Sequence, residues 1–556
     1  MVHLMNKESE RFIMGDKLLI KFISIIEYLL LCSIILYFNY PFVVINSKFD
    51  DILIISIVTI FVLLLIYSII FIKRSDIHYI LPQILIFSFV VRAIPNFRLS
   101  YPPLHDPYFY FVTSLNIMDN GTLEPIYNWW YSIIDMQLKW PVIQLLTTVL
   151  YQISAIDSLN LLRFQEPAIG SLTFLVVYIL TKFVTNDYKI AFIAALLASF
   201  NDILIFYQSE YHPQGLAIII FIFIIFAYLK LNHDVRYRLI FIIFAISFIF
   251  VHHFSSLFIV LIFGLYLTII YVLNQIKLIR NKFELSANDK LSLSIVILTG
   301  FMYHIFNITF VTLIGKITLI SNYSLILSNS DVPLLTFILS STKWIMFVLT
   351  FVSIIYIYKT KNMNEIQIAS ILICVLFAGV VGSTITLFPL DRIIGFYVPL
   401  ASIFAALTLF RFMRYRMANK LVCIFLITIL IVSGIFNSQI PAIFFKSSDI
   451  NTFYWYSNKL PIMAEYKSAG EWIGKDTLKE SIYATEFDSR ISPFFYGNVS
   501  NENIYYLPDL TVQKIKNSRI DFIIFNSGLP YKTNPNTYFG NIDAIYHSGD
   551  VNIYKT

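Results

Sequence analysis

Residues 104–121 read LHDPYFYFVTSLNIMDNG and follow an apolar run, Ile77 to Pro95, that is long enough to cross a membrane. The quoted stretch places one carboxylate, Asp106, beside several aromatic residues. A charge at the mouth of a membrane bundle usually has a function. The alternative is an ordinary turn, because Asp-Pro often starts one and aromatic segments often lie along bilayer surfaces.

Composition indicates a polytopic α-helical membrane protein. Of the 556 residues, 58% are hydrophobic and 13% are charged, and the mean hydropathy is +0.74. About 13 apolar runs have spanning length. Three precede the quoted stretch, at Leu18–Phe38, Ile52–Ile72 and Ile77–Pro95, and the others start near Phe164, Ile190, Gly215, Leu239, Ser256, Leu291, Trp344, Ile366, Ile393 and Leu421. The three cysteines all lie inside apolar runs, so the sequence offers no disulfide framework or thiolate metal site.

Basic residues predict the orientation of the chain. The segment from Trp140 to Ile156 is apolar but short, and we place it in the outer loop as a helix that dips into the bilayer. With that choice, most loop lysines and arginines fall on the side of the N-terminus, which is the cytoplasmic side. We therefore expect a cytoplasmic N-terminus and an outer loop over residues 96–163. The net charge of +6 then reflects topology and not nucleic-acid binding.

The chain is expected to divide into a membrane domain, 1–437, and an extracytoplasmic domain, 438–556. Short strand-like runs at Ser481–Thr485 and Asp521–Phe525 mark the second domain. Asp543–Lys555 predicts a hairpin and Pro508–Ser518 a helix, which together indicate a small α/β domain. It contains no nucleophile elbow or P-loop, so we expect it to recognise an acceptor or to cap the membrane domain.

Polar residues gather in the loops that this topology places outside. Glu210 and His212 lie in the segment QSEYHPQG, and His252 and His253 open the segment HHFSS. Asp106, Glu210 and His212 could share one Mg²⁺ or Mn²⁺, or one carboxylate could act alone as a general base. The alternative for Glu210 and His212 is a solvated turn that caps two helices. For the two histidines it is an interfacial position with their polar tips in water.

Arg392 lies beside Asp391 at the outer mouth of the twelfth predicted span. A guanidinium at this depth can bind a phosphate bidentately, so Arg392 is the predicted phosphate ligand. The alternatives are an ion pair with Asp391 and an anchor at the membrane interface. Arg92 and Arg163, in the third and fourth spans, could be pair partners inside the bundle.

These motifs resemble the GT-C superfamily of membrane glycosyltransferases, in particular the catalytic subunit of oligosaccharyltransferases and its archaeal relatives. Asp106-Pro107-Tyr108-Phe109 matches the motif that opens the family's first outer loop. Asn120-Gly121 and Asn128-Trp129-Trp130 match two motifs further along that loop. Glu210-Tyr211-His212 stands where the family carries its second acidic motif, and Arg392 resembles the arginine that contacts the lipid-linked diphosphate.

The resemblance implies transfer of a sugar from a polyprenyl phosphate or diphosphate donor to an acceptor at the outer face, in the assembly of a cell-surface glycan or glycoprotein. Asp106, Glu210 and His212 would carry catalysis or hold the metal ion. Arg392, His252 and His253 would bind the donor phosphate, and Tyr108, Trp129 and Trp130 would contact the substrate.

Three departures limit what the resemblance implies. Two extra spans precede the first outer loop, and His212 replaces an acid of the family's second motif. The tryptophan-tryptophan-aspartate motif of oligosaccharyltransferases is absent from the last 119 residues, which argues against protein N-glycosylation.

The rival hypotheses are a non-catalytic transporter or flippase of lipid-linked glycans and an anchored sensor or scaffold. The sequence shows no internal repeat of the kind transporters often carry, and anchoring needs far fewer spans.

Overall fold

The computed structural model describes most of the chain within its apolar runs and a smaller part elsewhere. The described residues, with short gaps inside some ranges, are 22–36, 48–71, 77–98, 110–121, 140–154, 156, 158–231, 234, 236–275, 287–306, 345–357, 363–384, 390–414, 417–438, 469–475, 483–485, 504–506, 521–526, 544–548 and 551–555. They form two compact units, one from residues 1–98 with 164–452 and the other from residues 99–163 with 453–556.

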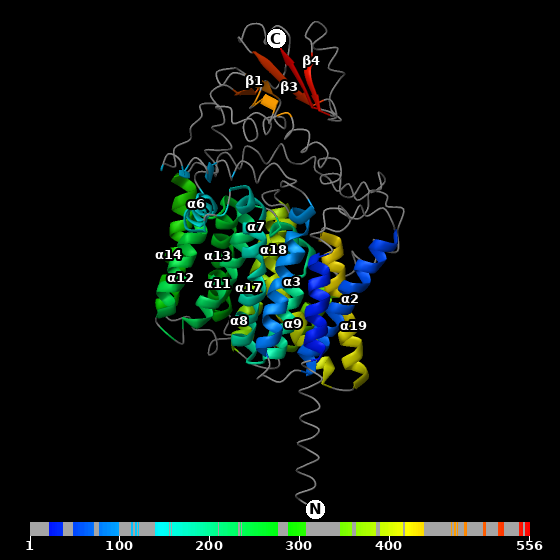
Figure 1. Ribbon diagram of the computed structural model, residues 1–556. Coiled ribbons are helices and arrows are strands. Elements are labelled where there is room, and N and C mark those ends of the chain that lie inside the picture. Colours follow the sequence, from blue (N-terminus) through cyan, green and yellow to red (C-terminus); the bar gives the residue numbers. More distant parts are fainter. Residues whose placement is uncertain are drawn as a thin grey trace, which may run out of the picture. The chain divides into compact units, whose positions relative to one another are not determined.

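Helices make up the first unit, and each predicted apolar run overlaps at least one of them (Figure 1). In chain order they are Phe22–Leu36, α2 (Lys48–Phe71), α3 (Ile77–Arg98), α7 (Ser158–Ser171), α8 (Thr173–Thr185), α9 (Tyr188–Ser199), α10 (Asp202–Tyr207), α11 (Pro213–Lys230), α12 (Arg236–Ile249), α13 (His253–Gln275), α14 (Ala287–Phe306), Ile345–Ile357, α17 (Met363–Thr384), α18 (Leu390–Met413) and α19 (Met417–Ser438).

Several of these helices are suited to a membrane by length and composition. Five described stretches reach spanning length with sufficient hydropathy: Asn160–Thr185, Pro213–Lys230, Phe254–Tyr271, Arg392–Met413 and Met417–Ile435. This supports the polytopic membrane class, while the number of spans stays a prediction. The runs predicted to start near Leu239 and Ser256 are two separate helices, because α12 ends at Ile249 and α13 begins at His253.

The centre of the helical unit is α9. Every residue from Ile190 to Ser199 is buried, and α9 packs against α8, α18, α2 and α19. Gly434 of α19 shows how closely these helices approach, since a Cβ at that position would overlap the carbonyl oxygen of Phe200. This buried centre is followed by α10 and then by the turn that carries the predicted site residue His212.

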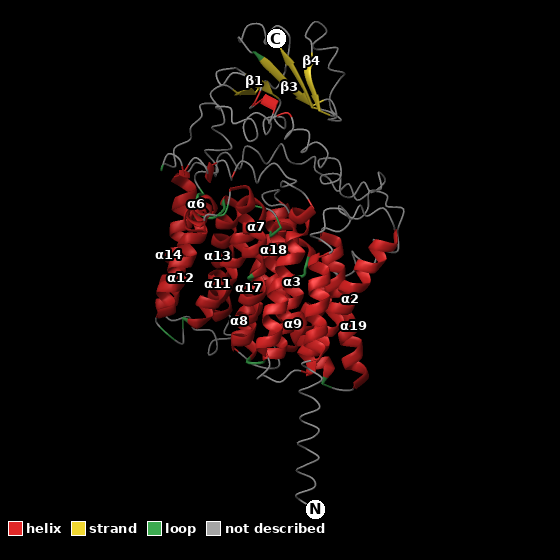
Figure 2. Cartoon of the chain, viewed as in Figure 1, coloured by secondary structure: helices red, strands yellow, loops and turns green. Residues whose placement is uncertain are grey.

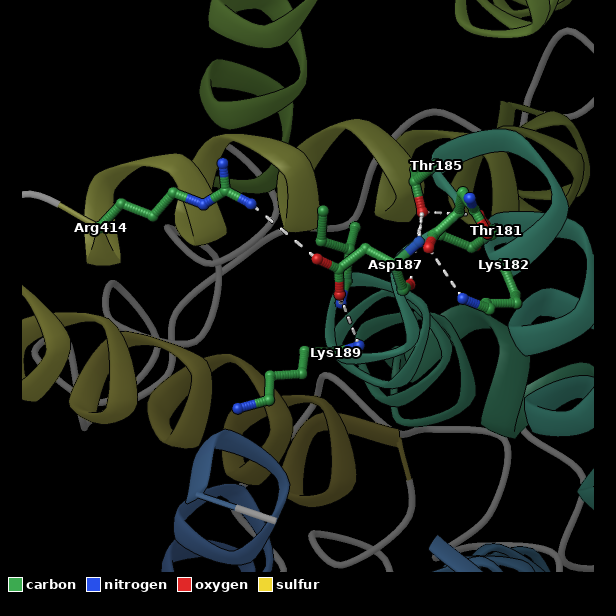
Figure 3. Close-up of polar contacts among 8 residues, drawn as sticks. Thr181, Lys182, Thr185, Asp187, Lys189 and Arg414 are labelled. Atoms are coloured by element: carbon green, nitrogen blue, oxygen red, sulfur yellow. Dashed lines mark hydrogen bonds and ion pairs between the residues drawn. The ribbon is translucent and has the colours of Figure 1, made fainter. Parts of the chain in front are cut away.

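The turn between α8 and α9 is built from local capping contacts (Figure 3). Asn186 adopts a left-handed conformation with φ +53°, which Asn tolerates better than most residues, and its carbonyl accepts a hydrogen bond of 2.8 Å from Lys182. Asp187 then caps α9 by accepting from the backbone N–H groups of Lys189 and Ile190. Arg414 lies 4.0 Å from the Asp187 carboxylate and ties the end of α18 to this turn.

A small polar cluster joins the first described helix to its neighbours. Glu27 is fully buried, and one of its carboxylate oxygens accepts a hydrogen bond of 2.7 Å from Ser68 of α2. One turn earlier, Ser24 accepts a bond of 2.8 Å from Gln83 of α3. Polar contacts of this kind hold helices together where apolar side chains have no preference between lipid and protein.

The last part of the chain forms a five-stranded mixed sheet with the order β2-β1-β3-β5-β4 (Figure 2). The strands are β1 (Tyr483–Thr485), β2 (Ile504–Tyr506), β3 (Phe522–Asn526), β4 (Ala544–Ser548) and β5 (Val551–Lys555). β1 pairs in parallel with β2 and β3, and β5 pairs antiparallel with β3 and β4. The hairpin predicted over Asp543–Lys555 is therefore present. The helix predicted over Pro508–Ser518 lies outside the described residues, so the α/β class of this segment stays a prediction.

The short apolar segment of the predicted outer loop is the helix α6 (Val142–Ser154). It buries one face, including Ile143 and Thr147, and exposes large apolar side chains such as Val149 and Ile153. An exposed apolar face suits a helix that lies in a bilayer surface, as predicted for this segment.

Candidate functional site at the starts of three helices

Three helices of the first unit begin next to one another. The His212 ring, which caps α11, lies 5.7 Å from the ring of His252, which immediately precedes α13. The Arg392 guanidinium in the first turn of α18 lies 5.7 Å from the ring of Phe254 in α13. Gln214 of α11 donates a hydrogen bond of 3.2 Å to the carbonyl of Arg392. The structure thus brings together His212, His252 and Arg392, three residues that the sequence predicted for one site.

His212 is held by the helix that follows it. Its Nδ1 accepts a hydrogen bond of 3.2 Å from the backbone N–H of Gln214, and Pro213 occupies the first helical position, where no N–H is needed. A neutral imidazole whose Nδ1 accepts carries its proton on Nε2. In this form Nε2 is a hydrogen-bond donor, which suits an anion better than a metal ion.

His252 is buried, with 2% of its surface exposed, and its Nδ1 lies 3.0 Å from the hydroxyl of Ser255. The interpretation of His252 as a side chain with its polar tip in water is therefore wrong. The His252 ring lies 5.7 Å from the His212 ring and 6.2 Å from the Phe254 ring. The side chain of His253 lies outside the described residues.

Arg392 is partly exposed, and the described part of the chain offers its guanidinium no hydrogen bond and no ion pair. Gln214 bonds to the backbone carbonyl of Arg392, and the Phe254 ring lies against one face of its guanidinium. The N–H donors of the guanidinium are therefore available to a ligand. The Asp391 side chain, the predicted alternative partner, lies outside the described residues. This arrangement is suited to binding an anion.

Gln214 was not predicted from the sequence. It is fully buried, its amide nitrogen bonds to the Arg392 carbonyl, and within the described residues its amide oxygen has no partner. Nothing in the QSEYHPQG segment distinguishes this glutamine from a solvated one. The packing of α11 against α18 places it at the site.

The other predicted site residues lie outside the described residues. They are Asp106, Glu210, Tyr108, Trp129 and Trp130. Among the residues that are described, no three His, Cys, Asp or Glu side chains gather as a metal site. Of the predicted metal ligands only His212 is described, and its Nδ1 lone pair already serves Gln214.

The geometry described here favours a negatively charged group. Each helix start carries a partial positive charge and backbone N–H groups without a partner inside the helix. α11, α13 and α18 start close together, and Arg392 adds a permanent charge at the same place. Such a combination is suited to an anion such as a phosphate, a sulfate or a carboxylate.

No family model and no curated protein sequence matches the chain. Its structure is similar to the crystal structure of ArnT from Cupriavidus metallidurans bound to undecaprenyl phosphate, with a TM-score of 0.51, 10% sequence identity and coverage of 85% of this chain and 97% of the ArnT chain. ArnT is a GT-C family glycosyltransferase. The chain shares its fold with this ArnT structure. The prediction drawn from short motifs is thus confirmed at the level of fold.

The apo structure of the same ArnT also matches, with a TM-score of 0.49, 11% identity and coverage of 81% of this chain and 92% of that chain. An identity this low leaves the activity of the chain to be argued from its own residues. Those residues are the ones at the starts of α11, α13 and α18.

Proposed function

We propose that this chain is a GT-C-type glycosyltransferase that moves a sugar from a polyprenyl phosphate-linked donor to an acceptor, in the assembly of a cell-surface glycan or glycoprotein. The observation that carries the proposal is the cluster of His212, His252 and Arg392 at three helix starts, within a fold that covers 97% of ArnT. The ArnT structure contains undecaprenyl phosphate, a lipid phosphate of the kind this cluster suits.

We propose that this multi-pass membrane protein has a cytoplasmic N-terminus and carries its site on the outer side of the membrane. Basic residues in the predicted inner loops support this orientation. Lys182, Lys189 and Arg414 belong to predicted inner loops, and all three lie at the turn between α8 and α9. The site residues His212 and Arg392 lie instead at the starts of α11 and α18.

In the proposed reaction, a nucleophile of the acceptor forms a bond to the anomeric carbon while the bond from that carbon to the phosphate oxygen breaks. The electron pair of the broken bond leaves with the lipid phosphate, and the proton of the acceptor passes to a base. Arg392 and the three helix starts would offset the negative charge that grows on the phosphate. His212 would donate from Nε2 to the same group.

The base and the sugar contacts are assigned from the motifs alone. Asp106 or Glu210 would take the proton of the acceptor, alone or with an Mg²⁺ or Mn²⁺ ion that offsets charge on the leaving group. Tyr108, Trp129 and Trp130 would stack against sugar faces.

The test is binding of undecaprenyl phosphate to the purified full-length chain, followed by release of the lipid phosphate from a panel of undecaprenyl phosphate sugars. Arg392→Gln removes the proposed phosphate ligand, and we expect a loss of about 1.5–3 kcal/mol for a charged hydrogen bond, or roughly 10- to 100-fold in Kd. Arg392→Lys keeps the charge without the planar fork, so we expect a smaller loss.

Arg236→Gln is the matched control, because Arg236 is an exposed arginine paired with Asp234 in the turn after α11. Its affinity for undecaprenyl phosphate should equal that of the wild type. Equal affinity in Arg392→Gln would remove Arg392 from the site. A wild-type chain that binds the lipid but releases none from any donor, while moving it across a vesicle bilayer, would support the flippase hypothesis instead.

A further inference from the structure

Arg92 of α3 is fully buried and makes a complete set of hydrogen bonds. Its Nε and one terminal nitrogen donate to the side-chain oxygen of Gln208, at 3.1 and 2.8 Å. The same terminal nitrogen donates to the carbonyl of Ser199 at 2.8 Å, and the other donates to the hydroxyl and carbonyl of Ser88 at 2.6 and 3.1 Å. A guanidinium can satisfy several acceptors in this way because its donors form a rigid planar fork.

Ser88 lies on α3 itself, and the other two acceptor residues of Arg92, Ser199 and Gln208, bracket one short segment of chain. Ser199 is the last residue of α9, and Gln208 ends the six-residue helix α10. One turn further along α3, Asn96 donates to the carbonyl of Ser209 at 3.1 Å. Arg92 and Asn96 therefore fasten both ends of the segment 199–209, which leads directly to Glu210 and His212. α3 in turn leads into the loop that contains Asp106.

A glycine in α7 leaves room for the contact between Arg92 and Gln208. At Gly170 a Cβ would lie 2.5 Å from Cβ of Gln208 and 3.0 Å from Nε of Arg92, so even an alanine would displace the pair. Gln208 is held from the far side as well, because its amide nitrogen donates to Thr173 of α8 at 2.8 Å. The position of the segment 199–209 thus depends on Arg92, Gln208 and a glycine that makes room for both.

We infer that Arg92 is a positioning residue for the proposed donor site. It holds the segment 199–209, and so places His212 and the start of α11, without itself touching the donor. The inference rests on the proposed function. It assigns a role to a buried charge in α3 that the motifs of the outer loops do not include.

Three variants test the inference in the full-length chain. Arg92→Met removes every donor, and Arg92→Lys keeps the charge but cannot reach acceptors on separate segments. Gly170→Ala displaces Gln208 and Arg92 without removing a polar group from either. We expect faster backbone amide exchange over residues 200–215 in all three. We also expect undecaprenyl phosphate to bind about tenfold more weakly, within the range found for residues coupled to a site they do not touch.

The measurements are made below the melting temperature of each variant, so that a loss of stability alone does not change the affinity. Arg236→Met serves as the control and should leave both the exchange over 200–215 and the affinity as in the wild type. If Arg92→Met does not fold, Arg92→Lys and Gly170→Ala carry the test. Unchanged affinity and exchange in folded variants would overturn the inference, whereas a wild-type chain that does not bind undecaprenyl phosphate would overturn the proposed function.

Discussion

The Nδ1 atom of His212 accepts a hydrogen bond of 3.2 Å from the backbone N–H of Gln214. His212 therefore caps α11, which agrees with the interpretation of this turn as a helix cap. The same bond directs the proton of the neutral ring to Nε2 and so supports a role in binding phosphate. The cap and the phosphate contact use different nitrogens, and they can be separated by substitution.

His212→Asn and His212→Ala separate these two roles. Asparagine is a good N-cap, so His212→Asn should melt close to the wild type, whereas His212→Ala should lose about 1 kcal/mol of stability. Both lose the imidazole Nε2, and both should bind undecaprenyl phosphate more weakly. Thermal unfolding and lipid titration measure the two effects. If His212→Asn binds the lipid as tightly as the wild type, His212 is a cap and nothing more.

Gly434→Ala tests the close packing of α19 against the end of α9. The added methyl would overlap the carbonyl oxygen of Phe200, a backbone atom that cannot rotate away, so we expect a loss of about 1–3 kcal/mol. Gly264→Ala is the matched control, because a Cβ at Gly264 meets no atom within 4 Å. It should be neutral or stabilising in a helix. Equal melting temperatures for the two variants would contradict the packing described here.

Ser68→Ala tests the polar contact that joins the first described helix to α2. Glu27 would lose its 2.7 Å hydrogen bond while remaining buried, which should cost about 1–3 kcal/mol. Replacing both partners, in Ser68→Ala with Glu27→Leu, removes the unsatisfied group and should recover most of that loss. Thermal unfolding of the two variants gives the comparison. A double variant less stable than Ser68→Ala would show that Glu27 is needed for another reason.

Arg92 and Glu166 are expected to balance each other's charge. Both are fully buried, Arg92 bonds to neutral oxygens, and within the described residues neither carboxylate oxygen of Glu166 has a hydrogen-bond partner. Glu166 lies one turn before Gly170 on α7. A Cβ at Gly215 would lie 2.7 Å from a Glu166 carboxylate oxygen and 3.4 Å from Cγ of Gln208, so both side chains border the same glycine, and Gln208 also accepts from Arg92. Arg92→Met should therefore be less harmful when Glu166→Gln accompanies it, with a coupling of about 1 kcal/mol or more.

The control for this cycle is Glu365→Gln, because Glu365 pairs with Arg411 and not with Arg92. Its effect should add to that of Arg92→Met without coupling. Additive effects for Arg92→Met and Glu166→Gln would show that the two charges act independently. Melting temperatures of the single and double variants are sufficient to decide.

Much of the architecture could be predicted from the sequence because its causes are local. The length of an apolar run and the period of a strand depend on neighbouring residues, and so α12, α13 and the β4–β5 hairpin lie where they were expected. The site could be predicted in part. The predicted topology placed His212, His252 and Arg392 on the outer side of the membrane, and so they were assigned to one site. The packing of α11, α13 and α18 then brings them together.

The sequence by itself determined the membrane class, the apolar helices and the polar turns that carry His212, His252 and Arg392, since hydropathy and charge act over short stretches of chain. Only the tertiary structure decided which groups these turns meet. It buried His252, brought Gln214 to Arg392, and gave Arg92 the neutral oxygens of Gln208 and Ser199 as partners. A buried charge can be satisfied by a carboxylate or by several neutral acceptors, and the packing of distant helices selects between them.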